Sequence, residues 1–221
     1  SLLFKPAGFS QKKYSFITIF TYGLVLFSPV IFQRVFQVSS AQIIQLTTFA
    51  YFFGAVLMIF YRFKSQLFNL ETRQKNLLIA FLIGIIGIPV SLLVQMAILQ
   101  VEQRFLGQTV SSQNTQTIVQ LIKENMIFIL ATTIAGPIME EFVFRRAIFG
   151  SLEGKLGFFI PALLSSVLFA LAHNDGHYLL YAGLGFLFCG MYHYSGRIWT
   201  SMITHVGMNL LVVLTQLALQ R

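Results

Sequence analysis

Six polar residues lie in apolar stretches of the sequence and are the ones whose types could do chemistry: Glu140, Glu141, Arg145, His173, His205 and Asn209. An unpaired carboxylate at the centre of a membrane helix costs at least about 2.5 kcal/mol, so two adjacent acids there require partners. Arg145 follows Glu141 by four residues, which puts both side chains on one helix face as a neutralising pair. Glu140 lies about 100° around the helix, and a carboxylate held beside another in low dielectric is a candidate general base.

Two further segments supply the other polar groups. His205 and Asn209 are four residues apart and project to one side of a helix, and His173 ends a separate apolar segment. Because polar groups inside a membrane face one another rather than lipid, we expect the three segments to meet at one site. There Glu140, oriented with His173, would deprotonate a water that attacks a carbonyl carbon. His205 and Asn209 would donate hydrogen bonds to the developing oxyanion.

The elements that position these residues are membrane helices. The chain of 221 residues is 56% hydrophobic and 10% charged, with a mean hydropathy of +0.76, whereas an ordinary soluble domain has about 25% charged residues. Several apolar stretches reach the roughly 17 to 25 residues that cross a bilayer as a helix. We predict an all-α, polytopic transmembrane helix bundle with about seven spans, at 15–32, 41–61, 76–100, 126–150, 156–173, 178–194 and 198–219. The polar stretch 101–125 is an outer loop, an interfacial helix or an eighth span.

The basic residues orient the bundle. The formal net charge is +8, but these residues lie between apolar segments, so we expect the lipid bilayer and no nucleic acid as a partner. With the N-terminus inside, only Arg34, Arg104, Lys123 and Arg221 of the 15 basic residues fall outside, as the positive-inside rule requires. Helix rise then places Glu140 about 21 Å from the outer end of its span, which predicts a site at the midplane or in the cytoplasmic half. No repeat or linker divides the chain, so residues 1–221 are predicted to be one membrane domain.

Two other histidines are expected to lie outside the site. His177 belongs to a polar turn, Asn-Asp-Gly-His, that follows His173 directly, and we expect it to be solvated. His193 is flanked by Tyr192 and Tyr194, as in an interfacial aromatic belt.

Taken together, the three polar segments resemble the signature motifs of the CPBP family, also called the Abi or CAAX-protease family of intramembrane proteases. The motifs are EEFVFR at 140–145, FALAH at 169–173 and HVGMN at 205–209, within a candidate catalytic core at 126–214. The resemblance implies an intramembrane protease in which Glu140 activates water and Glu141 and Arg145 support it. It assigns the two histidines and the asparagine to the water and oxyanion site. Family members usually have eight spans.

Whether the site holds a metal is left open by the motifs. Zinc bound by His173, His205 and Glu140 is one alternative, because catalytic zinc takes three N/O ligands and a water. The HExxH helix of common metalloproteases is missing, and a lone cysteine, Cys189, offers no thiolate zinc site. Asparagine is an ordinary oxyanion donor, so we expect no cofactor.

The expected substrate is a small hydrophobic peptide or leader peptide, admitted from the bilayer. The small size and the 24 phenylalanines are similar to bacterial members of the resembled family, so we expect the bacterial cytoplasmic membrane and do not favour prenylated substrates. Three alternatives remain: a non-catalytic bacteriocin-immunity or signalling partner, a proton-coupled transporter, and a purely structural cluster of both acids with Arg145 and Arg146. The oligomeric state does not follow from the sequence.

Overall fold

The computed structural model describes residues 8–108 and 113–219. Its α-helices are α1 (Gln11–Phe36), α2 (Ser40–Lys64), α3 (Leu77–Leu106), α4 (Gln113–Glu124), α5 (Phe128–Leu130), α6 (Gly136–Glu140), α7 (Gly150–Leu156), α8 (Phe159–His173), α9 (Tyr178–Ser195) and α10 (Ile198–Leu219). A 3-10 helix, η1 (Asn69–Arg73), follows α2, and two π-helices, η2 (Ala131–Ala135) and η3 (Glu141–Phe149), flank α6. These two ranges contain no β-strand, only an isolated bridge between Phe9 and Ser65. The predicted all-α class is therefore confirmed.

The predicted spans coincide with helices, but not all to the same degree. Four helices, α1, α2, α3 and α10, are long and apolar enough to cross a membrane. The segment predicted at 126–150 is a helical run from α5 through α7, and α8 is apolar but has 15 residues. In the stretch 101–125, α3 continues to Leu106, and α4 has 12 residues, shorter than the roughly 17 needed to span a bilayer. The described part of this stretch thus contains a short helix that is not long enough to span a bilayer by itself.

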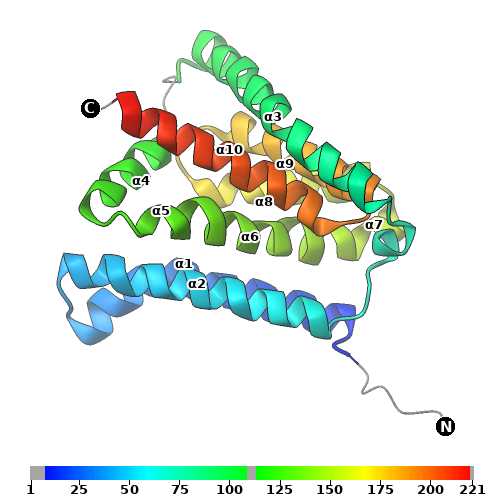
Figure 1. Ribbon diagram of the computed structural model, residues 1–221, viewed down its shortest axis with the longest axis horizontal. Coiled ribbons are helices and arrows are strands. Elements are labelled where there is room, and N and C mark those ends of the chain that lie inside the picture. The colour runs from blue at the N-terminus through cyan, green and yellow to red at the C-terminus, as the bar shows by residue number, and fades with distance from the viewer. Residues whose placement is uncertain (1–7, 109–112, 220–221) are drawn as a thin grey trace.

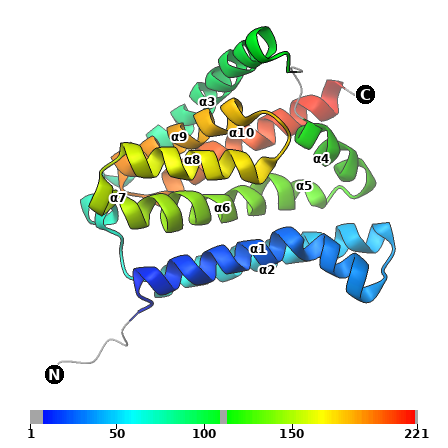
Figure 2. The same ribbon diagram turned by 180° about the vertical axis from the view of Figure 1, so that it is seen from behind.

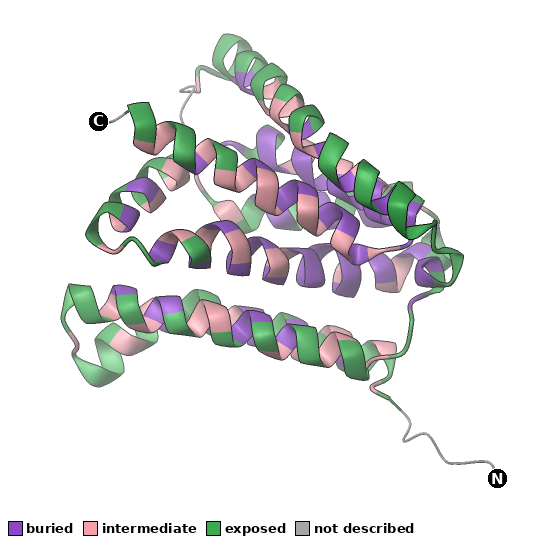
Figure 3. Ribbon diagram, in the orientation of Figure 1, coloured by how far each residue is buried: buried purple, intermediate pink, exposed green. Residues whose placement is uncertain are grey.

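The helices form two groups (Figure 1). α1 and α2 lie side by side as an antiparallel pair, and α1 packs against η3 of the second group. In the second group, α3 packs against α10 and α9, and α8 packs against α9 and η3, an arrangement that Figure 2 shows from behind. Buried residues concentrate where the central helical run meets α8, α9 and α10, while the outer faces of α1, α2 and α3 are largely exposed (Figure 3). Those exposed faces are rich in Phe, Leu and Ile, as expected of surfaces that contact lipid.

Two ends of the molecule can be distinguished. We call the end formed by η1, α7 and the start of α10 the basic end, because it carries Lys12, Lys13, Arg62, Lys64, Arg73, Lys75, Lys155 and Arg197. The opposite end, which we call the α4 end, carries α4, the α1–α2 connection and the end of α10 (Figure 1).

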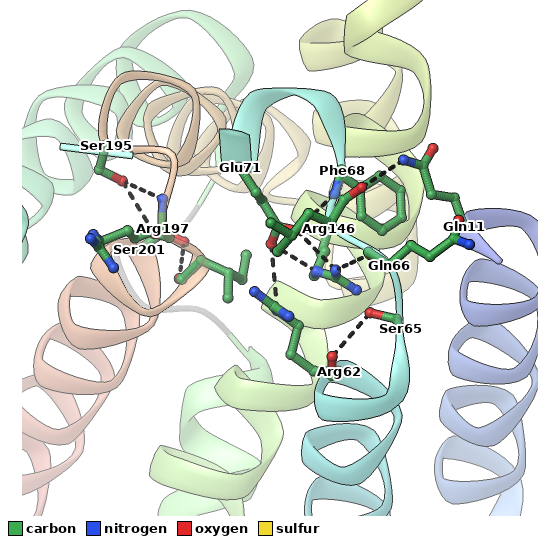
Figure 4. Close-up of polar contacts among 12 residues, drawn as sticks. Gln11, Arg62, Ser65, Gln66, Phe68, Glu71, Arg146, Ser195, Arg197 and Ser201 are labelled. Carbon is green, nitrogen blue, oxygen red and sulfur yellow. Dashed lines mark hydrogen bonds and ion pairs between the residues drawn. The ribbon is translucent and has the colours of Figure 1, made fainter. Parts of the chain in front are cut away.

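A buried ion pair ties the basic end together (Figure 4). Arg146 of η3 is fully buried, and its Nε and Nη2 donate to the two carboxylate oxygens of Glu71 in η1, both at 2.9 Å. Its Nη2 also donates to the Gln66 carbonyl at 3.1 Å, and the guanidinium lies over the rings of Tyr14 and Phe68. A bidentate pair with aromatic rings against the guanidinium is the geometry that suits arginine in a dry site. Arg146 therefore does not belong to a cluster with the two central acids.

The environment of Glu71 keeps this carboxylate ionised. Burial alone would raise its pKa, but the hydrogen bonds and charge of Arg146, the charge of Arg62 at 3.5 Å and the Phe68 N–H outweigh it. The pKa of Glu71 is therefore lowered below its ordinary value.

Candidate active site

The two adjacent glutamates lie where α6 ends and the π-helix η3 begins. Pro137 in the preceding turn has no amide hydrogen, and the N–H of Glu141 donates to the carbonyls of Pro137 and Ile138. π-Turns inside helices are rare and often occur at functional sites. The wider turn sets where the side chains after Glu140 project, which hydrophobic periodicity does not predict.

His205 of α10 lies between the two carboxylates. Its Nδ1 is 2.9 Å from Glu141 Oε1, and its Nε2 is 3.5 Å from Glu140 Oε2. The hydroxyl of Tyr22 in α1 donates to Glu140 Oε1 at 3.4 Å. The Glu141 side chain is fully enclosed, whereas that of Glu140 is 17% exposed. One acid is thus locked into the structure, and the other keeps access to small molecules.

Arg145 pairs with the enclosed acid and with aromatic rings. Its Nε is 3.4 Å from Glu141 Oε1 across one helical turn, as the spacing predicts. The guanidinium is fully buried and lies 4.1 Å from the ring centroid of Phe169 and 5.0 Å from that of Phe188. Cation–π contacts of this kind gain strength when they are desolvated. Arg145 therefore neutralises Glu141 in a dry, aromatic pocket and leaves Glu140 unpaired by arginine.

His173 lies at the C-terminal end of α8, and the structure gives it a different partner from the one expected. Its Nδ1 is 2.9 Å from the Phe169 carbonyl, and its ring stacks on Tyr181 with the centroids 3.8 Å apart. Because a carbonyl only accepts hydrogen bonds, Nδ1 is the protonated nitrogen, and Nε2 of the neutral ring is an acceptor. In the described chain no hydrogen bond joins His173 directly to Glu140. His173 could therefore orient Glu140, as predicted, only through a water between them.

A cavity of about 110 Å³ joins the histidines to the asparagine. His173, His205 and Asn209 all line it, as the shared helix face of the last two predicts. Its apolar wall includes Leu184 and Met208. Neither glutamate lines this cavity, and Glu140 is reached from it through His205.

The cavity extends toward the α4 end. Gln95 of α3, Asn114 and Ile118 of α4 and Gln216 of α10 line that part of it. The cavity therefore runs from the histidines toward the α4 end, and the expected depth of the site in the membrane stays a prediction.

The two histidines placed outside the site behave differently from each other. His177 is 2% exposed, and its Nδ1 is 2.6 Å from Glu102 Oε2, so the expectation that it is solvated is wrong. The sequence gives no sign of this contact, because Glu102 is 75 residues away at the end of α3. His193 is one-third exposed and pairs with Glu153 at 3.0 Å, which agrees with an interfacial position.

Two tyrosines at the site were not predicted. Tyr22 contacts Glu140, and Tyr181 stacks on His173. Neither belongs to the three motifs, and Tyr22 is separated from its partner by 118 residues, so only the helix packing reveals it.

The three residues of the zinc alternative, His173, His205 and Glu140, do not come together as a set of metal ligands in the described residues. His205 and Glu140 are neighbours at 3.5 Å, but no group of three His, Cys, Asp or Glu side chains in residues 8–108 and 113–219 has the arrangement of a metal site. The donor set therefore does not fit a three-ligand zinc site.

The fold and the buried cluster of Glu and His side chains define a polytopic helical membrane protein. Comparisons with known proteins show which family it is similar to. Residues 122–211 match the family model described as type II CAAX prenyl endopeptidase Rce1-like. The resemblance of the three motifs is thus confirmed, because all three lie within the residues that match the Rce1-like model. No solved structure matches the chain.

Curated relatives agree with this family. A protein named "Putative membrane peptidase YdiL" from Bacillus subtilis is 38% identical over 151 residues, covering 67% of this chain and 62% of that relative. The membrane-embedded CAAX protease MroQ of Staphylococcus aureus is 28% identical over 221 residues, covering 92% of this chain and 89% of MroQ. The match therefore spans about three fifths of YdiL but most of MroQ. Together with the apolar helices, these relatives identify an integral membrane protein and support a peptidase role.

Proposed function

We propose that this protein is an intramembrane endopeptidase that hydrolyses a peptide bond in a small hydrophobic or membrane-associated peptide through a water activated by Glu140. The observation that supports it most is the placement of His205 between Glu140 and Glu141, beside a cavity lined by His173 and Asn209. The accessible carboxylate is then the proton acceptor, and the enclosed one holds His205.

Each side chain has a role that its contacts allow. Glu141, already paired with Arg145, accepts from His205 Nδ1 and so fixes the ring. His205 then donates from Nε2 to an oxyanion only in its doubly protonated form, because Nδ1 is committed to a carboxylate. Asn209 offers a second donor from the same helix face. His173, with Nδ1 held by a carbonyl, accepts a hydrogen bond from the attacking water at Nε2.

The cavity and its surroundings support a proposal for the substrate class. Around the histidines the lining is apolar and amide-bearing, and the lining residues within 8–108 and 113–219 include no Asp, Glu, Lys or Arg. A charged side chain near the scissile bond would lose its hydration there without a partner. We therefore propose an uncharged, hydrophobic peptide or leader peptide rather than a prenylated one, in a bacterial cytoplasmic membrane with the N-terminus inside.

The test compares purified wild type with Glu140→Gln for cleavage of hydrophobic peptides, with Glu124→Gln, an exposed acid of α4, as the matched control. Loss of a positioned general base typically costs 10²-fold to 10⁴-fold, so we expect Glu140→Gln to lose at least roughly 10²-fold in kcat while Glu124→Gln keeps it. A strong zinc chelator is added in parallel, and chelation that abolishes cleavage would overturn the metal-free mechanism. Full activity of Glu140→Gln would overturn the assignment of the base. Absence of any cleavage by the folded wild type would instead favour the immunity or signalling role.

A further inference from the structure

Tyr181 of α9 holds the ring of His173 in place. The two rings stack with centroids 3.8 Å apart and planes inclined by 20°, and Phe169 meets the histidine edge-on at 4.5 Å. Together with the bond from His173 Nδ1 to the Phe169 carbonyl, these contacts cover the ring from several sides. A ring fixed in this way keeps Nε2 at a constant position relative to the cavity that both His173 and Tyr181 line.

Tyr181 is itself held by the turn that joins α8 to α9. Its hydroxyl donates to Asp175 Oδ2 at 2.9 Å, and the other oxygen of the same carboxylate accepts from the His177 N–H at 3.2 Å. Asp175 thus connects the tyrosine hydroxyl to the backbone of its own turn. The turn includes Asn174 in a left-handed conformation, φ 46°, and Gly176 at φ 90°, so it reverses the chain within a few residues.

Glu102 anchors this turn from α3. Its carboxylate is 1% exposed and accepts from the N–H of Leu180, in the first turn of α9, at 3.0 Å. The second oxygen lies 2.6 Å from His177 Nδ1. An acid at a helix N-terminus interacts favourably with the orphan amides and the helix dipole. The α8–α9 turn is therefore tied both to α9 and to a helix that lies more than 70 residues earlier in the chain.

We propose that Tyr181 is a positioning residue for His173, oriented by Asp175, with the turn fixed by the Glu102–His177 contact. The inference rests on the proposed function only in that His173 then acts on the attacking water. A displacement of a reacting group by about 1 Å can cost 10²-fold in rate, so the stacked ring has a measurable part in turnover. Because Tyr181 acts through the histidine, its loss should lower kcat far more than it changes KM, although Tyr181 also lines the cavity.

The experiment uses the full chain in detergent or nanodiscs and two substitutions. Tyr181→Leu removes the stacked ring, and Tyr181→Phe removes only the hydroxyl that Asp175 holds. The matched control is Tyr178→Phe, because Tyr178 lies in the same helical turn but is 46% exposed. Thermal unfolding of each variant shows whether the fold survives.

We expect kcat to fall roughly 10-fold in Tyr181→Phe and up to about 10²-fold in Tyr181→Leu, with KM within about 2-fold of wild type. Tyr178→Phe keeps both constants. In a His173→Ala background, Tyr181→Leu lowers kcat no further, because residues that act as a unit are not additive. An equal loss in both backgrounds, or a change in KM alone, would overturn the proposal.

A second readout is independent of cleavage. Nitrogen NMR of histidine-labelled protein reports which ring nitrogen of His173 is protonated; we expect Nδ1–H in wild type and in Tyr178→Phe, and a mixture of tautomers in Tyr181→Leu. This change in a protein that cleaves no peptide would leave the positioning intact and overturn only the proposed function. An unchanged signal in folded Tyr181→Leu would overturn the positioning role.

Discussion

At the scale of single residues, Glu140 and Glu141 are neighbours in sequence but differ in surroundings. Glu141 is fully enclosed and faces His205 and Arg145, whereas Glu140 is partly exposed and meets Tyr22 and His205 at 3.4 and 3.5 Å. Full enclosure, the ion pair with Arg145 and the 2.9 Å contact with His205 fix Glu141 as a structural group. The looser contacts of the other leave it able to take up a proton.

This difference predicts that substitutions of the two acids affect stability to very different extents. Glu141→Ala leaves the buried Arg145 without its carboxylate, and breaking such a pair costs about 3–5 kcal/mol. Glu140→Gln keeps the volume of the side chain and leaves no buried cation without a partner. Its free energy of unfolding should therefore be close to that of wild type. Denaturant titration in detergent measures both; a Glu141→Ala protein as stable as wild type would show that the aromatic rings suffice for Arg145.

Part of this site could be predicted from spacing and part could not. The four-residue intervals correctly place Arg145 beside Glu141, and His205 with Asn209 on one face of the cavity. No local pattern reveals Tyr22 at Glu140, because this contact arises only from the packing of α1 on η3. The burial of His177 is not predicted for the same reason. Its polar turn is typical of a solvated segment, and its buried partner Glu102 lies on a helix far away in the sequence.

At the scale of elements, two glycines let α3 approach α10 and α9 closely. A Cβ on Gly87 would lie 2.2 Å from Thr204 Oγ1 and 2.5 Å from Met191 Cε, and the Thr204 hydroxyl donates to the Gly84 carbonyl at 2.7 Å. Small residues at helix contacts in membranes allow such backbone approach. Because Thr204 directly precedes His205, this contact also fixes the position of His205 along the helix axis relative to α3.

We therefore expect Gly87→Ala to reduce both stability and kcat, since α3 must shift away from the residue next to His205. The matched control is Gly23→Ala in α1, where an added Cβ meets no atom within 4 Å. Alanine is favoured over glycine in a helix by about 1 kcal/mol, so the control should be neutral or slightly stabilising. Thermal unfolding and peptide cleavage are measured for both variants. Equal stability and equal kcat in Gly87→Ala and Gly23→Ala would contradict this view.

The Glu71–Arg146 pair that joins η1 to η3 predicts a dependence of stability on pH. Because the pKa of Glu71 is lower in the folded protein than in the unfolded chain, its contribution is complete above the unfolded pKa, about 4.3, and is lost as pH falls through the folded pKa. Glu71→Gln should be less stable at pH 7 and should lose less stability on acidification. Unfolding curves of both proteins from pH 7 to pH 3 decide this, and parallel losses would exclude Glu71 as the cause.

The elements were predicted better than their details. Long apolar runs locate the helices, because hydrophobicity over some 20 residues is a strong signal. The π-turns around α6 arise from local backbone bonding near Pro137 and tertiary packing, for which an apolar run gives no indication. The 12-residue α4 likewise gives no long apolar run in the sequence, because only one of its faces is apolar.

At the scale of the whole molecule, the distribution of charge predicts the topology. The basic end should face the cytoplasm, so the cavity, which extends toward α4, should open to the outer half. In a Cys189→Ala background, an impermeant thiol reagent on intact cells should label Ser40→Cys and not Lys12→Cys. Labelling of Lys12→Cys and not of Ser40→Cys would show that the protein has the opposite orientation, with the cavity on the cytoplasmic side.

We propose that the helical run containing Glu140, the end of α8 and the middle of α10 form one hydrolytic site. The most direct measurement is kcat for a cleaved hydrophobic peptide in Glu140→Gln, His173→Ala and their combination, with folding checked for each. We predict that each single variant loses at least roughly 10²-fold and that the combination loses little more than the worse single variant, as for residues that act as a unit. Full activity in either single variant, or losses that simply multiply, would contradict it.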